Sequence, residues 1–469
     1  MMNVINVCKT VKLDGLTEAA KQAKAVHAPV LFSFAEIMET EDPFSFFAKG
    51  SSLSSGKRFI FGNEEMMIAG LGAACTFSAT GNQRFDRVKR DWQQAAERLV
   101  LRAQPGAETG KPMLVGGFSF DPEAAHSSLW APFADALFYL PAWFLRVQNQ
   151  QVILTHSMIC RPGVPLEQLV AQFSREEERF RLAKPISSFE TEKRSSIFPL
   201  QDRESWRELV TKAIVQMHHS DLRKIVLART LQADLVEKPD LALLLKRLAD
   251  RQKGSYLFCL ETPEGAFLGA TPERLIKKQG ATIETACVAG SAPRGDTKEA
   301  DMRLAAALLA DPKNCKEHHY VVTMITSELR KFAQTVDWPD QPQILKNKNI
   351  QHLYTPVHAV ADPSVSIFDL LQTLHPTPAL GGLPQADALN WLRTNEAIDR
   401  GFYGAPIGWC DCDGNGEFVV GIRSALFAGC RAVLYAGCGV IEGSNPDSEF
   451  TETALKFRPI LDVLPGENE

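Results

Sequence analysis

The sequence lacks any apolar run long enough to cross a bilayer, and its first thirteen residues lack the basic start and apolar core of a secretion signal. It also lacks a long run of Lys and Arg: 51 basic residues stand against 56 acidic ones, a formal net charge of −5. A nucleic acid is therefore a poor candidate partner. We expect a soluble, cytoplasmic protein that contacts neither a membrane nor a nucleic acid.

Several catalytic motifs are absent as well. There is no P-loop, no G-x-G-x-x-G turn after a strand and no G-x-S-x-G elbow. Nucleotide hydrolysis, hydride transfer and triad hydrolysis all lose support. No repeat of fixed period is present, which argues against a solenoid.

Cysteines are scattered, and most of the ten lie inside apolar runs, as Cys75, Cys259 and Cys438 do. In a reducing compartment such residues behave as small buried hydrophobic groups. Cys410 and Cys412 form a C-x-C pair beside two aspartates, but no second Cys or His pair stands at the spacing of a zinc site. We therefore expect neither disulfides nor zinc.

The arrangement of elements favours an α+β fold. Hydrophobic residues make up 45% and charged residues 23%, as in globular proteins. Few strand-like runs are joined by regular helical crossovers, which favours large antiparallel sheets flanked by helices. Segment 183–199 is predicted to link a variable N-terminal region, 1–190, to a second region, 200–465, of the same globule. The predicted strands are 30–34, 58–62, 113–118, 137–147, 151–159, 224–233, 255–261, 281–288, 417–427 and 432–436, and the predicted helices are 85–102, 202–219, 298–310, 315–332, 385–397 and 447–461.

Two predicted helices carry acidic residues beside their apolar stripes. Glu317 stands four and seven residues before Val321 and Met324, so its carboxylate either leans toward the interior or complements the helix dipole. Glu449, Glu452 and Lys456 share a ridge of the last helix, which is either a solvated face or part of a site. The glycines upstream of that helix could let backbone amides approach an anion.

Two further charged residues lie beside buried strands. Lys224 begins an apolar strand, and Glu273 follows a Gly-Ala-Thr-Pro turn. A desolvated lysine can act as a general base and a desolvated glutamate as a general acid, although exposed charges at strand ends would look the same.

Taken together, these segments resemble the chorismate-utilising enzymes, a family that includes isochorismate and salicylate synthases and the large subunits of anthranilate and aminodeoxychorismate synthases. The resemblance covers about residues 200–460. It implies the fold of anthranilate synthase component I. Its motifs are Lys224-Ile-Val-Leu-Ala-Arg229, Gly269-Ala-Thr-Pro-Glu-Arg274, Glu317-His318, Leu374-His-Pro-Thr-Pro-Ala379, Gly421-Ile-Arg423 and Ala436-Gly-Cys-Gly439, followed by Glu449 to Lys456.

The resemblance implies a magnesium site and a substrate site. Mg²⁺ would be held by Glu317 and Glu452, with Glu449 as a further ligand or holding a metal-bound water, and would grip the ring carboxylate of chorismate. Arg423 and Tyr403 would bind the enolpyruvyl carboxylate. The implied substrate-binding set is completed by Gly290, Ser291, His375, Thr377, Gly437, Gly439 and Lys456.

The implied chemistry needs a base and an acid on opposite faces of the ring. Lys224 would take a proton from water as it attacks C2, and Glu273 would donate one to the hydroxyl that leaves C4. The ammonia-using branches typically have Gln at the position of Lys224, so no amidotransferase subunit is expected and the chain could act as a monomer. Asn314 stands one helical turn before Glu317, where some relatives carry an acid.

The segment from Leu374 to Gly382 is similar to the isochorismate-forming branch, in which pyruvate is retained. In the first 190 residues, Asp42-Pro-Phe-Ser-Phe-Phe47 and Gly116-Gly-Phe-Ser-Phe120 resemble the isochorismate synthases of the menaquinone pathway. The alternatives are an isochorismate synthase for catechol siderophores and a salicylate synthase that expels pyruvate.

Overall fold

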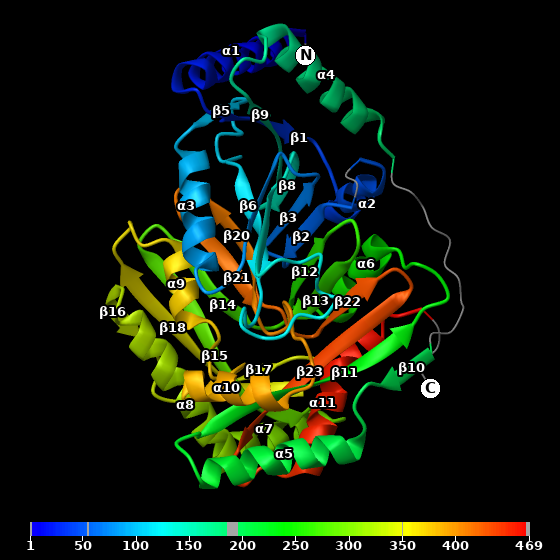
Figure 1. Ribbon diagram of the computed structural model, residues 1–469, viewed down its shortest axis with the longest axis vertical. Coiled ribbons are helices and arrows are strands. Elements are labelled where there is room, and N and C mark those ends of the chain that lie inside the picture. Colours follow the sequence, from blue (N-terminus) through cyan, green and yellow to red (C-terminus); the bar gives the residue numbers. More distant parts are fainter. Residues whose placement is uncertain (1, 54–55, 185–195, 349, 466–469) are drawn as a thin grey trace.

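The computed structural model describes residues 2–53, 56–184, 196–348 and 350–465, whose strands form two large, mostly antiparallel sheets (Figure 1). Among the strands of the described residues, only β1 and β5 pair in parallel. Helices α1 and α4 lie together at one end of the molecule, and α5, α7, α8 and α11 lie at the other (Figure 1).

The larger sheet has thirteen strands. Residues from both halves of the chain build it, because β2 pairs with β12. Its strands, in spatial order, are β10 (Ser196–Pro199), β11 (Lys224–Asp234), β23 (Arg431–Ile441), β22 (Ser424–Ala428), β13 (Ala266–Thr271), β12 (Tyr256–Glu261), β2 (Arg58–Gly62), β3 (Met66–Leu71), β8 (Trp143–Gln148), β9 (Gln151–Cys160), β1 (Val30–Met38) and β5 (Leu99–Ala103), with β19 (Gly382–Leu383) beside β11.

The second sheet has ten strands and also combines both halves of the chain, because β6 pairs with β20. Its strands, in spatial order, are β16 (Ala333–Asp337), β18 (Ile350–Ala361), β15 (Thr282–Pro293), β14 (Arg274–Gln279), β21 (Gly416–Val420), β20 (Pro406–Asp411), β6 (Met113–Phe118), β7 (Ala136–Leu140) and β4 (Cys75–Ala79), with β17 (Gln343–Lys346) beside β18.

Two neighbouring strand pairs pass from one sheet to the other. The chain leaves β13 in the larger sheet and enters β14 in the second through Pro272 and Glu273, and it returns from β21 to β22 through residues 421–423. The two crossings are bonded to each other, since the amide of Val420 donates to the Glu273 carbonyl at 3.0 Å and that of Ala270 donates to the Arg423 carbonyl at 3.2 Å. Short polar segments are thereby fixed at the junction of the sheets.

Helices cover these sheets, and α8 and α11 matter most for the site. Asp311 caps α8 by accepting from the amide of Asn314 at 2.7 Å, and Asn445 caps α11 by accepting from the amides of Asp447 and Ser448. Proline follows each cap at the first helical position, where no backbone donor is lost. The helices are α1 (Met2–Val26), α2 (Pro43–Leu53), α3 (Arg84–Ala96), α4 (Leu166–Leu182), α5 (Arg203–His218), α6 (Leu241–Arg251), α7 (Lys298–Ala310), α8 (Pro312–Leu329), α9 (Ile367–Leu374), α10 (Gln385–Asn395) and α11 (Pro446–Leu461).

The predicted α+β class with large antiparallel sheets is confirmed, but several predicted elements are wrong in detail. The strand predicted over 137–147 is two strands in different sheets, divided at Pro141, and the one over 417–427 is likewise divided at the crossing. The helix predicted over 85–102 ends at Ala96 and is followed by β5. Helices α1, α2, α4, α6 and α9 were not predicted. Of the predicted linker, 185–195 lies outside the described residues and 196–199 forms β10.

Among the described helices, none combines the length and the apolar character needed to pass through a membrane.

Candidate active site

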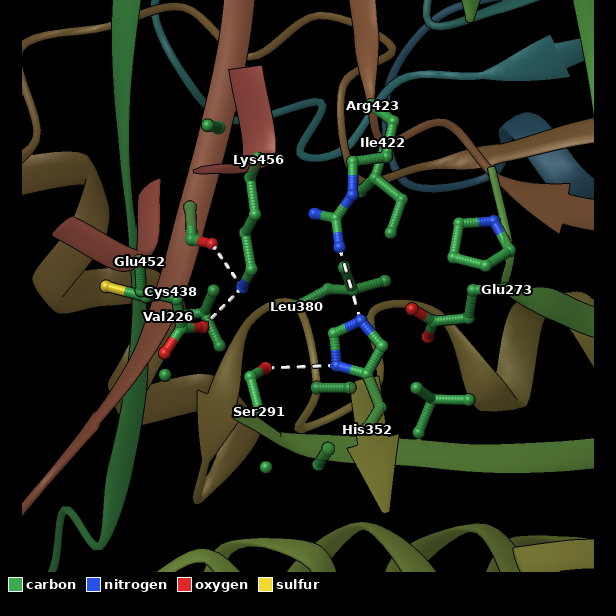
Figure 2. A pocket seen from close by; sticks show the side chains of 18 of the residues that line it. Val226, Glu273, Ser291, His352, Leu380, Ile422, Arg423, Cys438, Glu452 and Lys456 are labelled. Carbon is green, nitrogen blue, oxygen red and sulfur yellow. Dashed lines mark hydrogen bonds and ion pairs between the residues drawn. The ribbon is translucent and has the colours of Figure 1, made fainter. Parts of the chain in front are cut away.

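A cavity lies where the two crossings meet the ends of β11, β23, β15 and β18. Figure 2 shows Glu273 on one side of it and Glu452 and Lys456 on the other. The lining residues come from both sheets, from α8 and α11 and from two loops. They are Val226, Pro272, Glu273, Val288, Ala289, Gly290, Ser291, Glu317, His352, Ala379, Leu380, Tyr403, Ile422, Arg423, Tyr435, Ala436, Gly437, Cys438, Gly439, Glu452 and Lys456.

Lys224 is fully buried at the start of β11, and its Nζ lies 2.8 Å from Oε1 of Glu317. Gly439 on β23 makes room for this ion pair. A Cβ at that position would lie 2.2 Å from Oε1 of Glu317 and 2.9 Å from Cε of Lys224. Gly437 makes room for Tyr403 in the same way, because a Cβ at position 437 would lie 2.9 Å from the Tyr403 hydroxyl. The two glycines therefore provide space for the side chains of Glu317, Lys224 and Tyr403.

Glu273 sits on the first crossing and is buried. No side-chain hydrogen bond to its carboxyl is found in the described part of the chain. Burial raises the pKa of Glu273 to about 7, even though the charge of Arg423 opposes this shift. A carboxyl group that keeps its proton near neutral pH can donate it to a leaving group.

Arg423 sits on the second crossing and is buried, with a backbone φ of 51°, in the left-handed region that is unusual for a residue other than glycine. Such a conformation persists only where the surroundings impose it, here through the bonded crossings. A planar guanidinium in a cavity is suited to binding a carboxylate with two parallel hydrogen bonds.

Tyr403 lies on the wall beside Arg423. Its ring stacks on Tyr435 at a centroid distance of 5.2 Å, and the Tyr435 hydroxyl accepts from the indole nitrogen of Trp130 at 3.0 Å. Burial raises the pKa of Tyr403, so its hydroxyl remains a neutral donor.

Helix α11 presents Glu452 and Lys456 to the cavity. Lys456 Nζ lies 2.6 Å from Oε1 of Glu452 and donates to the Gly437 carbonyl at 2.8 Å (Figure 2). Burial alone would raise the pKa of Glu452, but the charge and hydrogen bond of Lys456 outweigh it and lower the pKa.

Glu449 is buried one turn earlier on α11 and is not part of the cavity wall. Lys313 from α8 donates to its Oε1 at 2.7 Å. Burial raises the pKa of Glu449, against the charge of Lys313. The three acidic residues predicted as metal ligands are thus each paired with a different lysine.

The donor set fits Mg²⁺ in its chemistry. Glu317 and Glu452 offer hard carboxylate oxygens from two different helices to one cavity. Within the described ranges, however, no three His, Cys, Asp or Glu side chains are grouped closely enough to hold a metal ion. The carboxylates would have to exchange their lysine partners for the ion.

Gly290 and Ser291 form an irregular step in β15, where the register with β18 shifts. Gly290 has a φ of 79°, and the side-chain oxygen of Asn314 accepts from the amide of Ser291 at 3.2 Å. Asn314 therefore shapes this segment of the wall.

Two of the predicted substrate-binding residues are not on the wall. His375 donates through Nε2 to the carbonyl of Phe120 at 2.9 Å and packs against the Phe120 ring, and the buried hydroxyl of Thr377 has no hydrogen-bond partner among the described residues. The loop they belong to does reach the cavity through Ala379 and Leu380. Their motif supports the wall from behind.

The remaining predicted residues are brought together. Ten of them line the cavity, Lys224 is off the wall but pairs with the lining residue Glu317, and Glu449 is off the wall one helical turn before the lining residue Glu452. His352 and Lys313 were not among the predicted site residues. His352 is on the cavity wall, and Lys313 pairs with Glu449.

A sequence profile of the family described as chorismate binding enzyme matches residues 18–465, and the chain belongs to this family. Among its relatives, isochorismate synthase MenF of Bacillus subtilis (strain 168) is 37% identical over 99% of both chains.

Among solved structures, MenF, the menaquinone-specific isochorismate synthase from Escherichia coli, is similar with a TM-score of 0.77 and 23% identity, covering 96% of this chain and 100% of that one. Anthranilate synthase component I from Streptococcus pneumoniae TIGR4 is similar with a TM-score of 0.66 and 17% identity, covering 84% and 92%. These two likenesses confirm the predicted fold.

Proposed function

We propose that this chain is an isochorismate synthase, which isomerises chorismate by adding water at C2 and releasing the hydroxyl from C4. The observation that carries the proposal is one cavity lined by a buried carboxyl group, Glu273, and a buried arginine, Arg423, beside which the buried Lys224 pairs with the lining residue Glu317. The full-length similarity to an isochorismate synthase supports the same reaction.

The chemistry assigns one proton transfer to each titrating group. Lys224 in its neutral form takes a proton from water as the oxygen bonds to C2, the ring double bonds shift, and Glu273 gives its proton to the oxygen that leaves C4 as water. One water enters and one leaves, so substrate and product are isomers. Because Lys224 is paired with Glu317, it becomes available as a base only when that pair opens.

We propose that Glu317 and Glu452 hold Mg²⁺, with Glu449 as a further ligand or holding a metal-bound water. When bound, Mg²⁺ would offset the charge of the ring carboxylate beside the reacting double bonds. Engagement of Glu317 as a ligand would also free Lys224 from its ion pair.

The substrate's enolpyruvyl carboxylate is assigned to Arg423 and Tyr403. Gly290, Ser291, Gly437, Gly439 and Lys456 complete the binding surface, and all cavity-lining residues fall within the catalytic region 200–465. His375 and Thr377 act from behind the wall. We further propose that the product serves menaquinone synthesis in the cytoplasm.

The test is to incubate the purified chain with chorismate and Mg²⁺, with and without ammonia, and to separate the products. Isochorismate formed without ammonia is expected. Salicylate with pyruvate, or an amine that forms only with ammonia, would contradict the assignment. The same incubation with EDTA should yield no product, and the Lys224→Gln variant should form product about a thousandfold more slowly than the wild type.

A further inference from the structure

His352 connects two cavity residues that lie on different elements. It is buried on β18, its Nδ1 lies 3.0 Å from the Ser291 hydroxyl on β15, and its Nε2 lies 3.3 Å from Nη2 of Arg423 on the second crossing (Figure 2). All three residues line the cavity. One imidazole therefore touches both an arginine and a hydroxyl that face the substrate space.

The chemistry of the partners fixes the protons in this chain of hydrogen bonds. An arginine side chain can only donate, so Nε2 of His352 must accept from Arg423. A neutral ring with a free lone pair on Nε2 carries its hydrogen on Nδ1. Burial, together with the charge of Arg423, lowers the pKa of His352 to about 3, so the ring is neutral at physiological pH.

The same reasoning orients the Ser291 hydroxyl. Because Nδ1 of His352 carries a hydrogen, Ser291 Oγ can only be the acceptor in its contact with the ring, which also has a hydrogen bond with the backbone of Gly290. The hydroxyl's own hydrogen then cannot return to His352, and no acceptor for it is found among the described residues. It is left to point toward the cavity that Ser291 lines.

We propose that His352 is a positioning residue that aims two hydrogen-bond donors, Arg423 and the Ser291 hydroxyl, at carboxylate oxygens of the bound substrate. This proposal rests on the proposed function for the identity of the substrate. The reverse tautomer would set an N–H against the guanidinium of Arg423. It would also let the Ser291 hydroxyl donate its hydrogen to the ring. The cavity would then lose the Ser291 donor, and Arg423 would be misplaced.

The proton positions can be observed directly. In protein labelled with ¹⁵N in its histidine rings, the His352 signals are identified by their loss in the His352→Phe variant. At neutral pH we expect a hydrogen on Nδ1 and none on Nε2. A hydrogen on Nε2, or on both nitrogens, would overturn the proposal.

Kinetics test whether this arrangement serves the substrate. His352→Phe keeps a ring of similar size but breaks both hydrogen bonds, and we expect KM for chorismate to rise roughly tenfold to a hundredfold while kcat changes much less. His352→Gln, which can still offer an oxygen to Arg423, should recover part of the loss. His358→Phe is the matched control, because it lies on the same face of β18 but is exposed, and its KM should equal the wild-type value.

A double-mutant cycle separates positioning from general structural support. Ser291→Ala should raise KM several-fold in the wild type but have almost no further effect in His352→Phe, since the hydroxyl is no longer oriented there. Effects that simply add would overturn the proposal. Failure of the proposed function would instead appear as a wild-type chain that makes no isochorismate, and the ring spectrum would still decide the proton positions.

Discussion

The buried carboxyl of Glu273 predicts a specific dependence of stability on pH. Its pKa rises from 4.5 to about 7 on folding because the group is buried. The folded protein therefore holds this proton in a range where the unfolded chain has lost it, so the group's contribution to stability falls as pH increases from about 4.5 to 7. Above that range the charged, buried carboxylate costs about 3 kcal/mol.

Glu273→Gln removes this titration and keeps nearly the same shape. We expect the variant to gain stability relative to the wild type by about 2 to 3 kcal/mol between about pH 5 and pH 8.5, measured by urea unfolding at both values. Glu264→Gln, at an exposed glutamate before β13 and thus at the opposite end of that strand from Glu273, is the control and should not change this dependence.

The same group should govern turnover. With Glu273 as the general acid, kcat of the wild type should fall above about pH 7, and Glu273→Gln should bind chorismate but show almost no turnover. If the difference in unfolding free energy between variant and wild type stays constant with pH, the Glu273 carboxyl is not desolvated in the folded protein. In that case its role as a proton donor at neutral pH loses its physical basis.

Three further substitutions test neighbouring parts of the site. Lys224→Gln should lower kcat by about a thousandfold in a product assay while chorismate still binds, and near-normal turnover would remove Lys224 as the base. Gly439→Ala should abolish most activity and lower the unfolding free energy by about 1 to 3 kcal/mol, because the new methyl group collides with the carboxylate of Glu317. A variant that is active and as stable as the wild type would contradict this packing. Lys313→Met removes the cation that neutralises a buried carboxylate of α11, so Mg²⁺ should bind roughly tenfold tighter by calorimetry in the absence of substrate. The exposed Lys316→Met on the same helix should bind Mg²⁺ as the wild type does, and equal affinities in all three proteins would refute the charge argument.

Local sequence patterns were sufficient for some elements. The run after Lys224 predicts a strand because its residues are apolar in succession, and they are buried on both faces of β11. The break at Pro141 was missed, although proline rarely continues a strand. Helix α4 was missed although Leu169 and Phe173 form its buried stripe, because charged residues dominate the rest of its sequence.

Local sequence patterns could not predict every residue of the site. His352 and His358 lie on the same face of one strand, six residues apart, and nothing in their surroundings in sequence distinguishes them. Only the sheet partners place the first beside Arg423 and leave the second exposed. The role of Lys313 could not be predicted from local sequence either, since its partner Glu449 is 136 residues away in sequence.

The crossings that carry Glu273 and Arg423 also affect how the protein unfolds, because they connect the two sheets. A ligand that contacts both Arg423 and the residues of α8 and α11 would link the two sheets non-covalently at their junction. Its binding energy would count toward keeping both sheets in one cooperative unit. We expect substrate or a close analogue to raise the melting temperature and to merge any separate melting steps into one.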